Sequence, residues 1–554
     1  MQNQTLTSCL QFTAEKYPAH GIHYVHENGL EEFQTYADLL IEAYALAGGF
    51  LESGHKPGDK VIISTLINRQ TISAVWGCFF AGLVPTILQT PLSMNDKSQA
   101  AEKMQNVYNQ LDYPDIIVSK IIPSNSEIPE AKFKLFEDLP KVKSTLNFIP
   151  KGEDLAFIQF SSGSTGEPKG IMLTHTNLTS NITSIIAGLE LTAHDRGGNW
   201  MPLYHDMGLI GFHFTPLVTG TNQYHIETID FIKNPSLWLD LLSNARISIS
   251  GSPNFGQSLT LRHIQRKKQE LTWDFSSVKA LLNGAEPISV KIMDEFTKAL
   301  ERYGFPENAM MPVYGMAEAT LAISFSPLMQ PSVTHMFDSS QLDLNGQAVI
   351  INSGSHKHAR QLTSVGMALN DIEIRVVNEN SEVLPKANVG HIQIKGPAVT
   401  KGYYKNPSDT SLLFSDEWLR TGDLGFFLDK HLFISGRYKD IIFMNGKNYF
   451  ANDLENLACS LDEISYGKVA FGGITDHKAG KDKIIIFAAG IPKSKATETL
   501  QTLRALFRKT LGIPIDELVI LRSNEFPKTS SGKVQRYKIL QRYQQGDFSA
   551  NRFK

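Results

Sequence analysis

Between residues 60 and 305, the apolar and polar positions follow two alternating patterns. Short apolar runs bounded by turn residues predict buried strands, and longer segments with an apolar position every three or four residues predict helices. The expected strands are residues 61–66, 155–160, 247–250 and 278–282, and the expected helices are residues 70–83, 177–189, 238–244 and 289–303. This alternation predicts an α/β fold with largely parallel sheets covered by helices.

The pattern changes after residue 366. Short alternating strands at residues 372–377, 391–395 and 431–435 predict a small β-rich subdomain. From residue 436 onward, helices at 453–461 and 498–511 and strands at 468–472 and 483–489 predict a compact α/β unit. We therefore expect two domains, residues 1–437 and 438–554. The sequence offers no long linker between them, so we expect any motion to occur at a tight hinge.

Composition narrows the class of protein. Hydrophobic residues make up 42% of the 554 positions and charged residues 20%, which is ordinary for a globular protein and excludes wholesale disorder. The net charge of −3 argues against a nucleic-acid-binding protein that depends on general basicity. The most apolar stretch, residues 73–88, is interrupted by Gly77, Gly82 and Pro85 and is too short for a membrane span.

The three cysteines, Cys9, Cys78 and Cys459, are far apart in the sequence. Their spacing provides neither a CxxC metal site nor a disulfide framework, which fits a reducing compartment. The N-terminal segment MQNQTLTSCLQF lacks the basic-then-apolar pattern of a signal peptide. We therefore expect a cytoplasmic protein with no nucleic-acid partner and no membrane span.

Residues 161–170 spell Ser-Ser-Gly-Ser-Thr-Gly-Glu-Pro-Lys-Gly, after an expected strand and before an expected helix. Glycines let a backbone bend so that several N–H groups face one anion. The Ser and Thr hydroxyls add donors and Lys169 adds positive charge, so this composition suits a phosphate-binding loop. It differs from the GxxxxGK[ST] loop because Gly170 follows the lysine. On composition alone, a flexible Ser/Gly turn is an equal alternative.

The spelling of this segment, followed by Thr174 and His175, resembles the signature of the adenylate-forming superfamily, which includes acyl-CoA synthetases, peptide-synthetase adenylation domains and luciferases. Further segments resemble the other motifs of the superfamily and occur in the family order. They are Asn-Gly-Ala-Glu-Pro at 283–287, Tyr-Gly-Met-Ala-Glu at 314–318, Thr-Gly-Asp at 421–423, Gly-Arg-Tyr-Lys-Asp at 436–440 and Pro-Lys-Thr-Ser-Ser-Gly-Lys at 527–533. The resemblance covers nearly the whole chain, and this ordered set is far more specific than any one motif.

The resemblance assigns a role to each motif. It implies ATP-binding positions in the phosphate loop, around adenine and at the ribose, namely Ser162, Gly163, Ser164, Thr165, Gly166, Lys169, Asn283, Gly284, Ala285, Tyr314, Gly315, Met316, Ala317, Asp423, Arg437 and Lys533. It further implies that Glu318 binds Mg²⁺, that Lys533 and Glu318 are catalytic, and that Lys439 is the hinge. The implied fold is a large N-terminal adenylate-forming domain, with two α/β subdomains and a small β-barrel-like subdomain, and a small mobile α+β C-terminal domain.

The chemistry of adenylate formation fits these residue types. A carboxylate attacks the α-phosphorus of ATP and expels pyrophosphate, so charge accumulates on phosphate oxygens and the site needs cations and N–H donors. Lys533 supplies a positive charge, and Glu318 suits a Mg²⁺ ion that also binds phosphate oxygens. Taken singly, each residue has a simpler interpretation: Lys533 as a solvated lysine, Asp423 as a turn residue, Glu318 as a helix cap and Tyr314 as a core residue.

Two segments resemble one branch of the superfamily, the fatty acyl-AMP ligases. They are Met-Pro-Leu-Tyr-His-Asp-Met-Gly-Leu-Ile-Gly at 201–211 and Ala-Glu-Ala-Thr at 317–320, where Ala317 stands in place of the usual threonine. The resemblance places His205, a catalytic candidate, beside the acyl pocket and the reacting carboxylate. A buried histidine satisfied by the backbone is an equal alternative. Met207, Ile210 and Phe214 are candidates either for the acyl pocket or for the core.

The spacing between two motifs also resembles that of the fatty acyl-AMP ligases. Gly366 lies 48 residues after Glu318, a longer connection than is typical of acyl-CoA synthetases. Fatty acyl-AMP ligases carry an insertion at this place, which corresponds here to residues 327–360. The resemblance implies that this insertion obstructs movement of the C-terminal domain or blocks a route for CoA. A lineage-specific surface loop is the alternative.

The resemblance implies a ligase with two steps. A fatty acid reacts with ATP to give acyl-AMP and pyrophosphate, and the acyl group then passes to the phosphopantetheine thiol of an acyl carrier protein. The expected partners are a fatty or other carboxylic acid and an acyl carrier protein, with ATP and Mg²⁺ as cofactors. The alternatives are an acyl-CoA synthetase, an enzyme that activates an amino acid whose amine pairs with Asp206, and a degenerate adenylate-binding scaffold.

Overall fold

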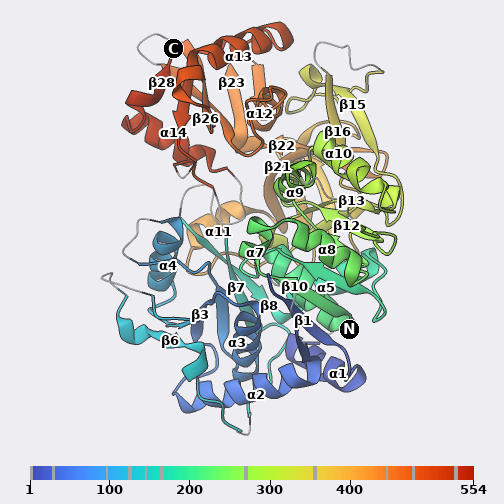
Figure 1. Cartoon of the computed structure of the whole chain (residues 1–554), viewed down its shortest axis with the longest axis vertical. Coiled ribbons are helices and arrows are strands. Elements are labelled where there is room, and N and C mark those ends of the chain that lie inside the picture. Colours follow the sequence, from blue (N-terminus) through green and yellow to red (C-terminus); the bar gives the residue numbers. More distant parts are fainter. Residues whose placement is uncertain are drawn as a thin grey trace.

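The computed structural model describes residues 4–27, 31–94, 98–122, 128–143, 146–161, 167–266, 272–352, 359–444, 447–476, 481–523, 525–528 and 534–554. The N-terminal part of the chain forms a large body, and the C-terminal residues form a smaller unit at one end of it, coloured orange to red at the top of Figure 1. This is the mixed α/β arrangement that the sequence predicts.

A large mixed sheet forms the centre of the body. Its strands follow the order β17 (Met367–Ala368), β14 (Ala322–Phe325), β13 (Met310–Gly315), β12 (Ala280–Asn283), β11 (Ile249–Gly251), β9 (Arg196–Asn199), β10 (Asn222–Ile226), β1 (Gly21–Val25) and β2 (Glu31–Thr35). The strands from β13 to β1 pair in parallel, whereas β17, β14 and β2 pair antiparallel. The carboxyl ends of β12 and β13 therefore lie at one edge of the sheet and carry two of the predicted motifs.

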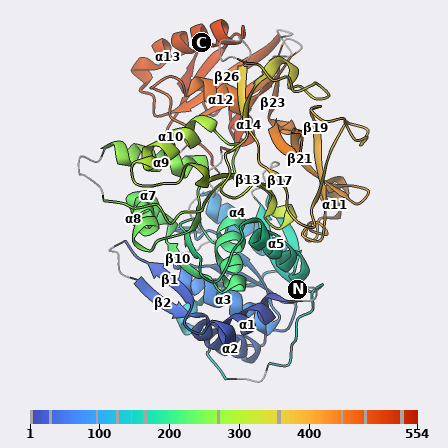
Figure 2. The same cartoon turned by 90° about the vertical axis from the view of Figure 1, so that its right-hand side faces the viewer.

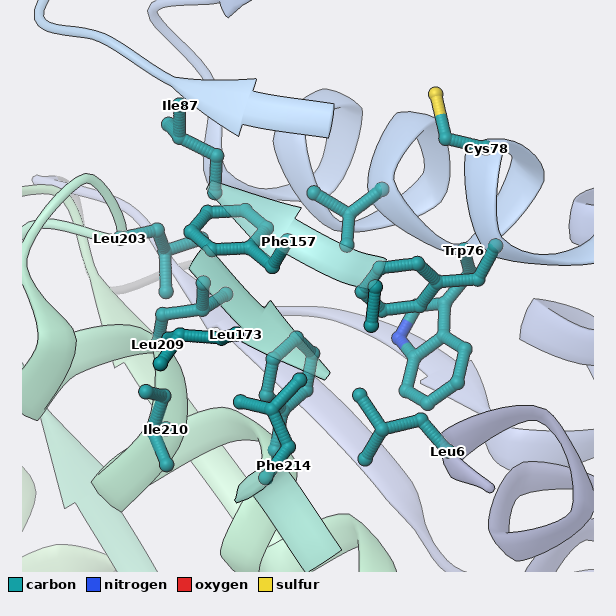
Figure 3. Close-up of a cluster of buried hydrophobic side chains, with 14 of the residues drawn as sticks. Leu6, Trp76, Cys78, Ile87, Phe157, Leu173, Leu203, Leu209, Ile210 and Phe214 are labelled. Carbon is teal, nitrogen blue, oxygen red and sulfur yellow. The ribbon is translucent and has the colours of Figure 1, made fainter. Parts of the chain in front are cut away.

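Two hydrophobic clusters flank this sheet. The first contains side chains of α1 (Leu6–Lys16), α2 (Tyr36–Glu52), α3 (Asn68–Ala81), α5 (His175–Gly188) and α6 (Thr215–Thr219). The second contains side chains of α7 (Thr228–Lys233), α8 (Ser236–Asn244), α9 (Asn254–Arg266) and α10 (Val290–Glu301). Figure 3 shows part of the first cluster, where Trp76, Phe157 and Phe214 are fully buried. Burial of such large apolar side chains is the main favourable term in folding.

A second, parallel sheet lies beside the first and follows the order β4 (Val84–Ile87), β3 (Lys60–Ser64), β5 (Asp115–Val118) and β6 (Phe133–Leu135). The side chains of β3 alternate between two cores, because Val61 and Ile63 pack with α2 and α3 whereas Ile62 packs with α4 (Gln99–Gln110). Helix α4 is therefore held on the opposite side of this sheet from α2 and α3. The sequence patterns used above did not identify α4.

The candidate phosphate loop lies in a β-hairpin. Strand β7 (Leu155–Ser161) pairs antiparallel with β8 (Lys169–Thr174), and Ser161 is opposite Lys169 in the register. The sequence predicts β7 and the following α5 correctly, but it misses β8 between them. The pairing places Ser161 and Lys169 side by side at the end of the hairpin from which Ser162–Gly166 continues, and these five residues lie outside the described residues.

The expected β-rich subdomain follows in the chain. Strands β18 (Glu373–Val377), β19 (Gly390–Lys395), β21 (Trp418–Leu428) and β20 (Phe414–Ser415) form an antiparallel sheet in which β22 (His431–Arg437) also pairs with β21. The predicted insertion, residues 327–360, contains β15 (Thr334–Asp338) and the first two residues of β16 (Ala359–Thr363), which pair as a hairpin. Phe337 of β15 is fully buried against Phe426 and Phe433, so part of the insertion belongs to the core of this subdomain.

The C-terminal unit begins with the hairpin of β23 (Ile441–Met444) and β24 (Lys447–Phe450), which follows directly after the predicted hinge. A mixed sheet follows in the order β25 (Val469–Asp476), β26 (Lys481–Ala489), β27 (Glu517–Leu521) and β28 (Arg552–Phe553). Helices α12 (Ala451–Ala458), α13 (Ala496–Thr510) and α14 (Arg536–Gln545) pack with it. Figure 2 shows the unit from the side, seated above α9, α10 and the β-rich subdomain.

Candidate active site

A cavity of about 1200 Å³ lies between the body and the C-terminal unit. Its lining brings together predicted residues that are hundreds of positions apart in the sequence. These are Lys169, His205, Ala285, Tyr314, Gly315, Met316, Ala317, Glu318, Asp423, Arg437 and Lys439. Ser162–Gly166 and Lys533 lie outside the described residues. The fold therefore gathers the described motifs at one place, as an ordered set of motifs for one reaction requires.

Asp423 is held at the wall of this cavity by a tyrosine and an arginine. Tyr314 donates a hydrogen bond from Oη to Oδ2 of Asp423 at 2.6 Å, and Arg437 donates from Nε to Oδ1 at 3.0 Å. Asp423 itself is almost fully buried. The buried position of Tyr314 and the adjacent carboxylate raise the pKa of the phenol, and Asp423 raises the pKa of Arg437. Because a carboxylate has about four acceptor positions, Asp423 can accept further hydrogen bonds from paired hydroxyls.

Glu318 also lines the cavity, on a segment with an unusual backbone. Tyr403 donates a hydrogen bond from Oη to Oε1 of Glu318 at 3.0 Å. Two residues later, Thr320 has φ 68° and ψ −61°, and the N–H of Leu321 bonds the carbonyl of Ala319 at 2.8 Å. This is a γ-turn of the rare, strained type, and such strain concentrates at functional sites.

The environment of Glu318 suits a cation. Burial raises the pKa of its carboxyl group, and the nearby Asp206 raises it further, while Tyr403 and Arg437 lower it. A buried carboxylate without full charge compensation is stabilised by a positive ion. Mg²⁺ is commonly bound by one or two carboxylates together with substrate phosphates. Glu318 therefore fits a site of that kind, although no group of three or more candidate metal ligands occurs within the part of the chain that the structure describes.

Lys169 extends from the first residue of β8 into the cavity. Its Nζ lies 2.8 Å from Oδ2 of Asp409, on α11 (Pro407–Leu413), and 5.1 Å from the centre of the Tyr403 ring. The lysine lowers the pKa of Asp409. Tyr403 and Asp409 both line the cavity, and neither is among the residues predicted from the sequence motifs. Neither belongs to a segment whose local spelling indicates chemistry, so only the three-dimensional fold connects them to the motifs.

His205 and Asp206 come directly before a π-helix, Met207–Phe214. Nδ1 of His205 lies 2.7 Å from Oδ1 of Asp206, and the backbone N–H of Met207 donates to the same carboxylate oxygen at 2.7 Å. π-Helical turns are rare and occur frequently at functional sites. Met207 lines the cavity, whereas Ile210 and Phe214 are fully buried in the core shown in Figure 3. The candidate pocket residues therefore divide into one wall residue and two core residues.

Apolar side chains also line the cavity, and together they are called the apolar wall. They are Ile185, Met207, Phe212, Leu282, Leu321 and Phe325. Small-molecule sites typically combine such apolar walls with a few polar groups that fix orientation. The wall gives the cavity a region suited to an aliphatic chain, next to the charged region around Glu318 and Asp423.

The turn after β12 lines the cavity with Ala285, Glu286 and Pro287. Ala285 lines the cavity with φ 66°, a left-handed conformation that is uncommon for a residue with a Cβ atom. Asn283 is fully buried, with Nδ2 facing Oδ1 of Asn254 at 3.5 Å, and neither Asn283 nor Gly284 lines the cavity. The predicted contact of Asn283 and Gly284 with adenine stays a prediction.

The described residues that directly follow Lys533 lie at the cavity, and they pair with the residues before the undescribed segment. Lys528 and Val534 form a β-bridge, and the N–H of Gln535 bonds the carbonyl of Pro527 at 2.9 Å. Arg536 bonds Glu455 at 2.7 and 2.6 Å and Asp440 at 3.0 Å. Val534, Gln535 and Arg536 all line the cavity. The C-terminal unit therefore contributes Val534, Gln535 and Arg536, the described residues that follow Lys533, to the wall of the cavity.

The insertion contacts the C-terminal unit directly. Arg360 of β16 lies with Nε 2.9 Å from Oδ1 of Asp453 on α12, and its Nη2 donates to the carbonyl of Ser435 at 2.6 Å. Its guanidinium group also lies over the ring of Phe450, 5.0 Å from the centre. Burial lowers the pKa of Arg360 and raises that of Asp453 to about 6. The hairpin thus holds the C-terminal unit through a partly buried ion pair.

Three kinds of comparison with known proteins all find similarity to enzymes that bind AMP or activate fatty acids. A family model described as AMP-binding enzyme matches residues 10–404. A putative acyl-CoA synthetase of Caulobacter vibrioides is 32% identical over 98% of this chain and 96% of its own length. The medium-chain-fatty-acid–[acyl-carrier-protein] ligase TtuA of Teredinibacter turnerae is 34% identical over 71% of this chain and 64% of its own length. A solved structure from studies of fatty acyl-adenylate ligases of E. coli and L. pneumophila superposes with a TM-score of 0.88 at 29% identity, covering 98% of both chains.

The structure also bears on the predicted absence of a membrane span. Among the described residues, none of the helices combines the length and apolar character needed to cross a bilayer. Residues 73–88, the most apolar stretch, belong largely to α3 and β4, which are buried in the body.

Proposed function

The chain belongs to the family of AMP-binding enzymes, and from this premise we propose that it is a fatty acyl-AMP ligase. It activates a fatty acid with ATP and then transfers the acyl group to the phosphopantetheine thiol of an acyl carrier protein. The observation that carries this proposal is the cavity in which Glu318, Asp423 and His205 meet an apolar wall. The likeness to TtuA and to the fatty acyl-adenylate ligase structure supports the same substrate and acceptor.

The first step makes one bond and breaks one bond. A carboxylate oxygen of the fatty acid attacks the α-phosphorus of ATP, and the bond from that phosphorus to the bridging oxygen of pyrophosphate breaks. We assign Asp423 and Arg437 to the ribose, with Tyr314 holding Asp423 in place and lying beside adenine. Lys169 and the Ser162–Gly166 segment hold the phosphates, and Lys533 compensates charge at the reacting oxygens.

We assign Glu318 as the Mg²⁺ ligand. A bound Mg²⁺ neutralises charge on the phosphate oxygens of the nucleotide. Tyr403 orients the Glu318 carboxylate through its hydrogen bond, and Asp206 places a second negative charge nearby. His205 lines the same cavity beside Asp206, and we assign it to orient the fatty-acid carboxylate for attack.

The thiol that accepts the acyl group must come from the acyl carrier protein. Cys459 lines the cavity, but burial raises the pKa of its thiol to about 12, so the reactive thiolate is scarce at neutral pH. Cys9 and Cys78 are buried in the body, and burial raises the pKa of Cys9 to about 11. None of the three cysteines is therefore suited to carry the acyl group.

We also propose that residues 1–437 and 438–554 are separate domains joined at Lys439. The C-terminal unit has hydrophobic clusters made of its own residues, which supports this division. Lys439 lies in a single 3₁₀ turn, Tyr438–Asp440, between β22 and β23, and few residues are enough to absorb the dihedral changes of a hinge. The hinge would let the unit withdraw Lys533 after adenylation and admit the carrier protein.

A second candidate acceptor is CoA, because one relative is named a putative acyl-CoA synthetase and matches almost the whole chain. The contact of Arg360 with Asp453 favours the carrier protein, since it ties the insertion to the unit that must move. Activation of an amino acid is less well supported. Asp206, which could select an amine, already contacts His205 and the N–H of Met207.

The substrate class is tested by ATP–pyrophosphate exchange with panels of fatty, aryl and amino acids. The proposal predicts exchange that depends on fatty acids of sufficient chain length to reach the apolar wall. The matched control is a Glu318→Gln variant, which keeps the size of the side chain and removes its charge. Exchange that is driven by amino acids and not by fatty acids would overturn the proposed substrate.

A further inference from the structure

Helix α4 carries a lysine into the same cavity from outside the recognised motifs. Nζ of Lys103 donates a hydrogen bond to the carbonyl of Phe160 at 3.0 Å, and Lys103 lines the cavity together with Ser161 and Lys169. Phe160 and Ser161 are the last residues of β7, directly before Ser162–Gly166. Lys103 is therefore held at the strand end from which the phosphate loop continues.

Other side chains of α4 contact the second side of the phosphate loop, at Pro168, and the C-terminal unit. Gln110 donates from Nε2 to the carbonyl of Pro168 at 3.2 Å, on the far side of the loop from Phe160. Gln99 donates to Oε1 of Gln535 at 2.7 Å, and Glu102 lies 3.8 Å from Nζ of Lys538. One helix thus contacts the loop expected to hold phosphates and the segment next to Lys533. Figure 1 shows α4 below the C-terminal unit.

The charge of Lys103 has no partner of the kind that Lys169 has. Lys169 is paired with the carboxylate of Asp409, whereas Lys103 forms no ion pair with a carboxylate in the described part of the chain. Burial lowers the pKa of Lys103 to about 8, so the ammonium form still predominates at neutral pH. A positive charge that is partly removed from water and has no counter-ion is unfavourable, and Lys103 is partly buried at the cavity wall. Lys103 uses one of its three N–H donors for Phe160, and among the described residues the other two have no acceptor and could donate to an anion.

We propose that Lys103 is a further phosphate-binding residue of the enzyme, which contacts the β- and γ-phosphates of ATP and the pyrophosphate that leaves. This inference rests on the proposed adenylation function, because only that reaction brings a triphosphate to this cavity. Lys103 transfers no proton in the step. Its ammonium group donates hydrogen bonds to oxygens that gain charge as the α-phosphorus bond to pyrophosphate breaks.

Nucleotide binding without fatty acid tests this role directly. Isothermal titration of ATP and of AMP compares ligands that share adenine, ribose and α-phosphate and differ only in the β- and γ-phosphates. Lys103→Met should weaken ATP binding by about ten- to a hundredfold, the usual effect of losing a hydrogen bond to a charged group. AMP binding should change by less than about twofold. Lys103→Arg should restore most of the ATP affinity, and Lys509→Met, an exposed lysine on α13, should change neither.

Two results would overturn the inference. Unchanged ATP affinity in Lys103→Met would show that the ammonium group does not contact the phosphates. Equal weakening of ATP and AMP would show that Lys103 only supports the fold around Phe160. The proposed function is tested separately, by fatty-acid-dependent pyrophosphate exchange in the unaltered protein, so the failure of one is distinguishable from the failure of the other.

Discussion

Tyr314 and Asp423 are 109 residues apart in the sequence, yet Oη of the tyrosine donates a 2.6 Å hydrogen bond to Oδ2 of the aspartate. This bond joins the end of β13 to β21 of the β-rich subdomain. The Tyr-Gly-Met-Ala-Glu and Thr-Gly-Asp motifs, which are separate in the sequence, are thus joined by a hydrogen bond. Arg437 donates to the other carboxylate oxygen of Asp423. The proposed nucleotide site therefore lies where two parts of the body meet.

Substitution of Asp423 tests the ribose assignment. Asp423→Asn keeps the shape of the side chain and removes its charge, so it weakens both the ion pair with Arg437 and the acceptor for hydroxyl groups. We expect ATP and AMP affinity to fall equally, by about ten- to a hundredfold, because both ligands contain the ribose. Titration with the two nucleotides provides the measurement. Tyr314→Phe, which removes only the hydroxyl, should have a smaller effect, and a loss confined to ATP would contradict the assignment.

Lys533 is assigned from its motif and from the position of its described neighbours Val534 and Gln535 at the cavity. Lys533→Ala should lower pyrophosphate exchange by roughly a hundredfold or more, the usual cost of losing a group that stabilises transition-state charge. ATP binding should be retained, since the other residues that we assign to the nucleotide belong to the body. Exchange kinetics and nucleotide titration of the same variant separate the two effects. Exchange at the rate of the unaltered protein would remove Lys533 from the mechanism.

The ion pair between Arg360 and Asp453 gives a test of the insertion. Deleting residues 327–360 would also remove Phe337 from the core, so its effect on CoA use would be confounded by unfolding. Removing one partner of the ion pair should destabilise the protein by about 3 kcal/mol, and replacing both by apolar residues should cost less. Urea unfolding of Arg360→Met, Asp453→Leu and the double variant measures the coupling between them.

The same variants also test whether the contact between Arg360 and Asp453 limits the use of CoA as the acyl acceptor. If the ion pair restrains the C-terminal unit, the double variant should form CoA thioester faster than the unaltered protein, at a similar rate of pyrophosphate exchange. Additive effects on stability, with no change in CoA use, would show that this contact is not a restraint and would favour a simple surface role for the rest of the insertion.

Buried histidines predict how stability depends on pH. His213 and His225 are almost fully buried and share Oε1 of Gln223 at 2.9 and 2.7 Å. Burial lowers their pKa values from 6.5 to about 4 and about 3. The unfolded chain therefore binds more protons below pH 6.5, and folding stability decreases as the pH falls from about 6.5 towards 4.

Each of these histidines should cost on the order of 2 kcal/mol of stability by pH 5. Urea unfolding at pH 7.5 and pH 5 measures the difference. A His225→Gln variant should be less stable at pH 7.5 but should lose less stability between the two values. An equal loss in the variant and in the unaltered protein would assign the effect to other groups.

Much of the architecture was predictable because its signals are local. The patterns of β3, β11, β12 and the helices α3, α5 and α10 gave the correct element types, with boundaries shifted by about two residues. Strand β8 was missed because its six residues, Lys169–Thr174, form a strand only through pairing with β7. Helix α4 does have apolar positions at Ala101, Met104, Val107 and Tyr108, and closer attention to helical spacing would have found it.

The site was predictable only as far as its motifs are spelled in the sequence. Motif order identified Glu318, Asp423 and Arg437, and the fold places all three at one cavity. Tyr403, Asp409 and Lys103 carry no local signature, since their relation to Glu318, Lys169 and Phe160 depends on contacts across the fold. The π-helix after Asp206 was also beyond the sequence patterns, because its sequence fits an ordinary buried helix equally well.

The central claim is that the chain activates a fatty acid and delivers it to a carrier protein. The most direct measurement is thioester formation from the same acyl-AMP, with a holo-acyl carrier protein and free CoA offered in parallel at equal thiol concentration. We predict acylated carrier protein, with CoA thioester at least about tenfold slower. CoA thioester formed as fast as acylated carrier protein, or faster, would contradict the account and would identify the chain as an acyl-CoA synthetase.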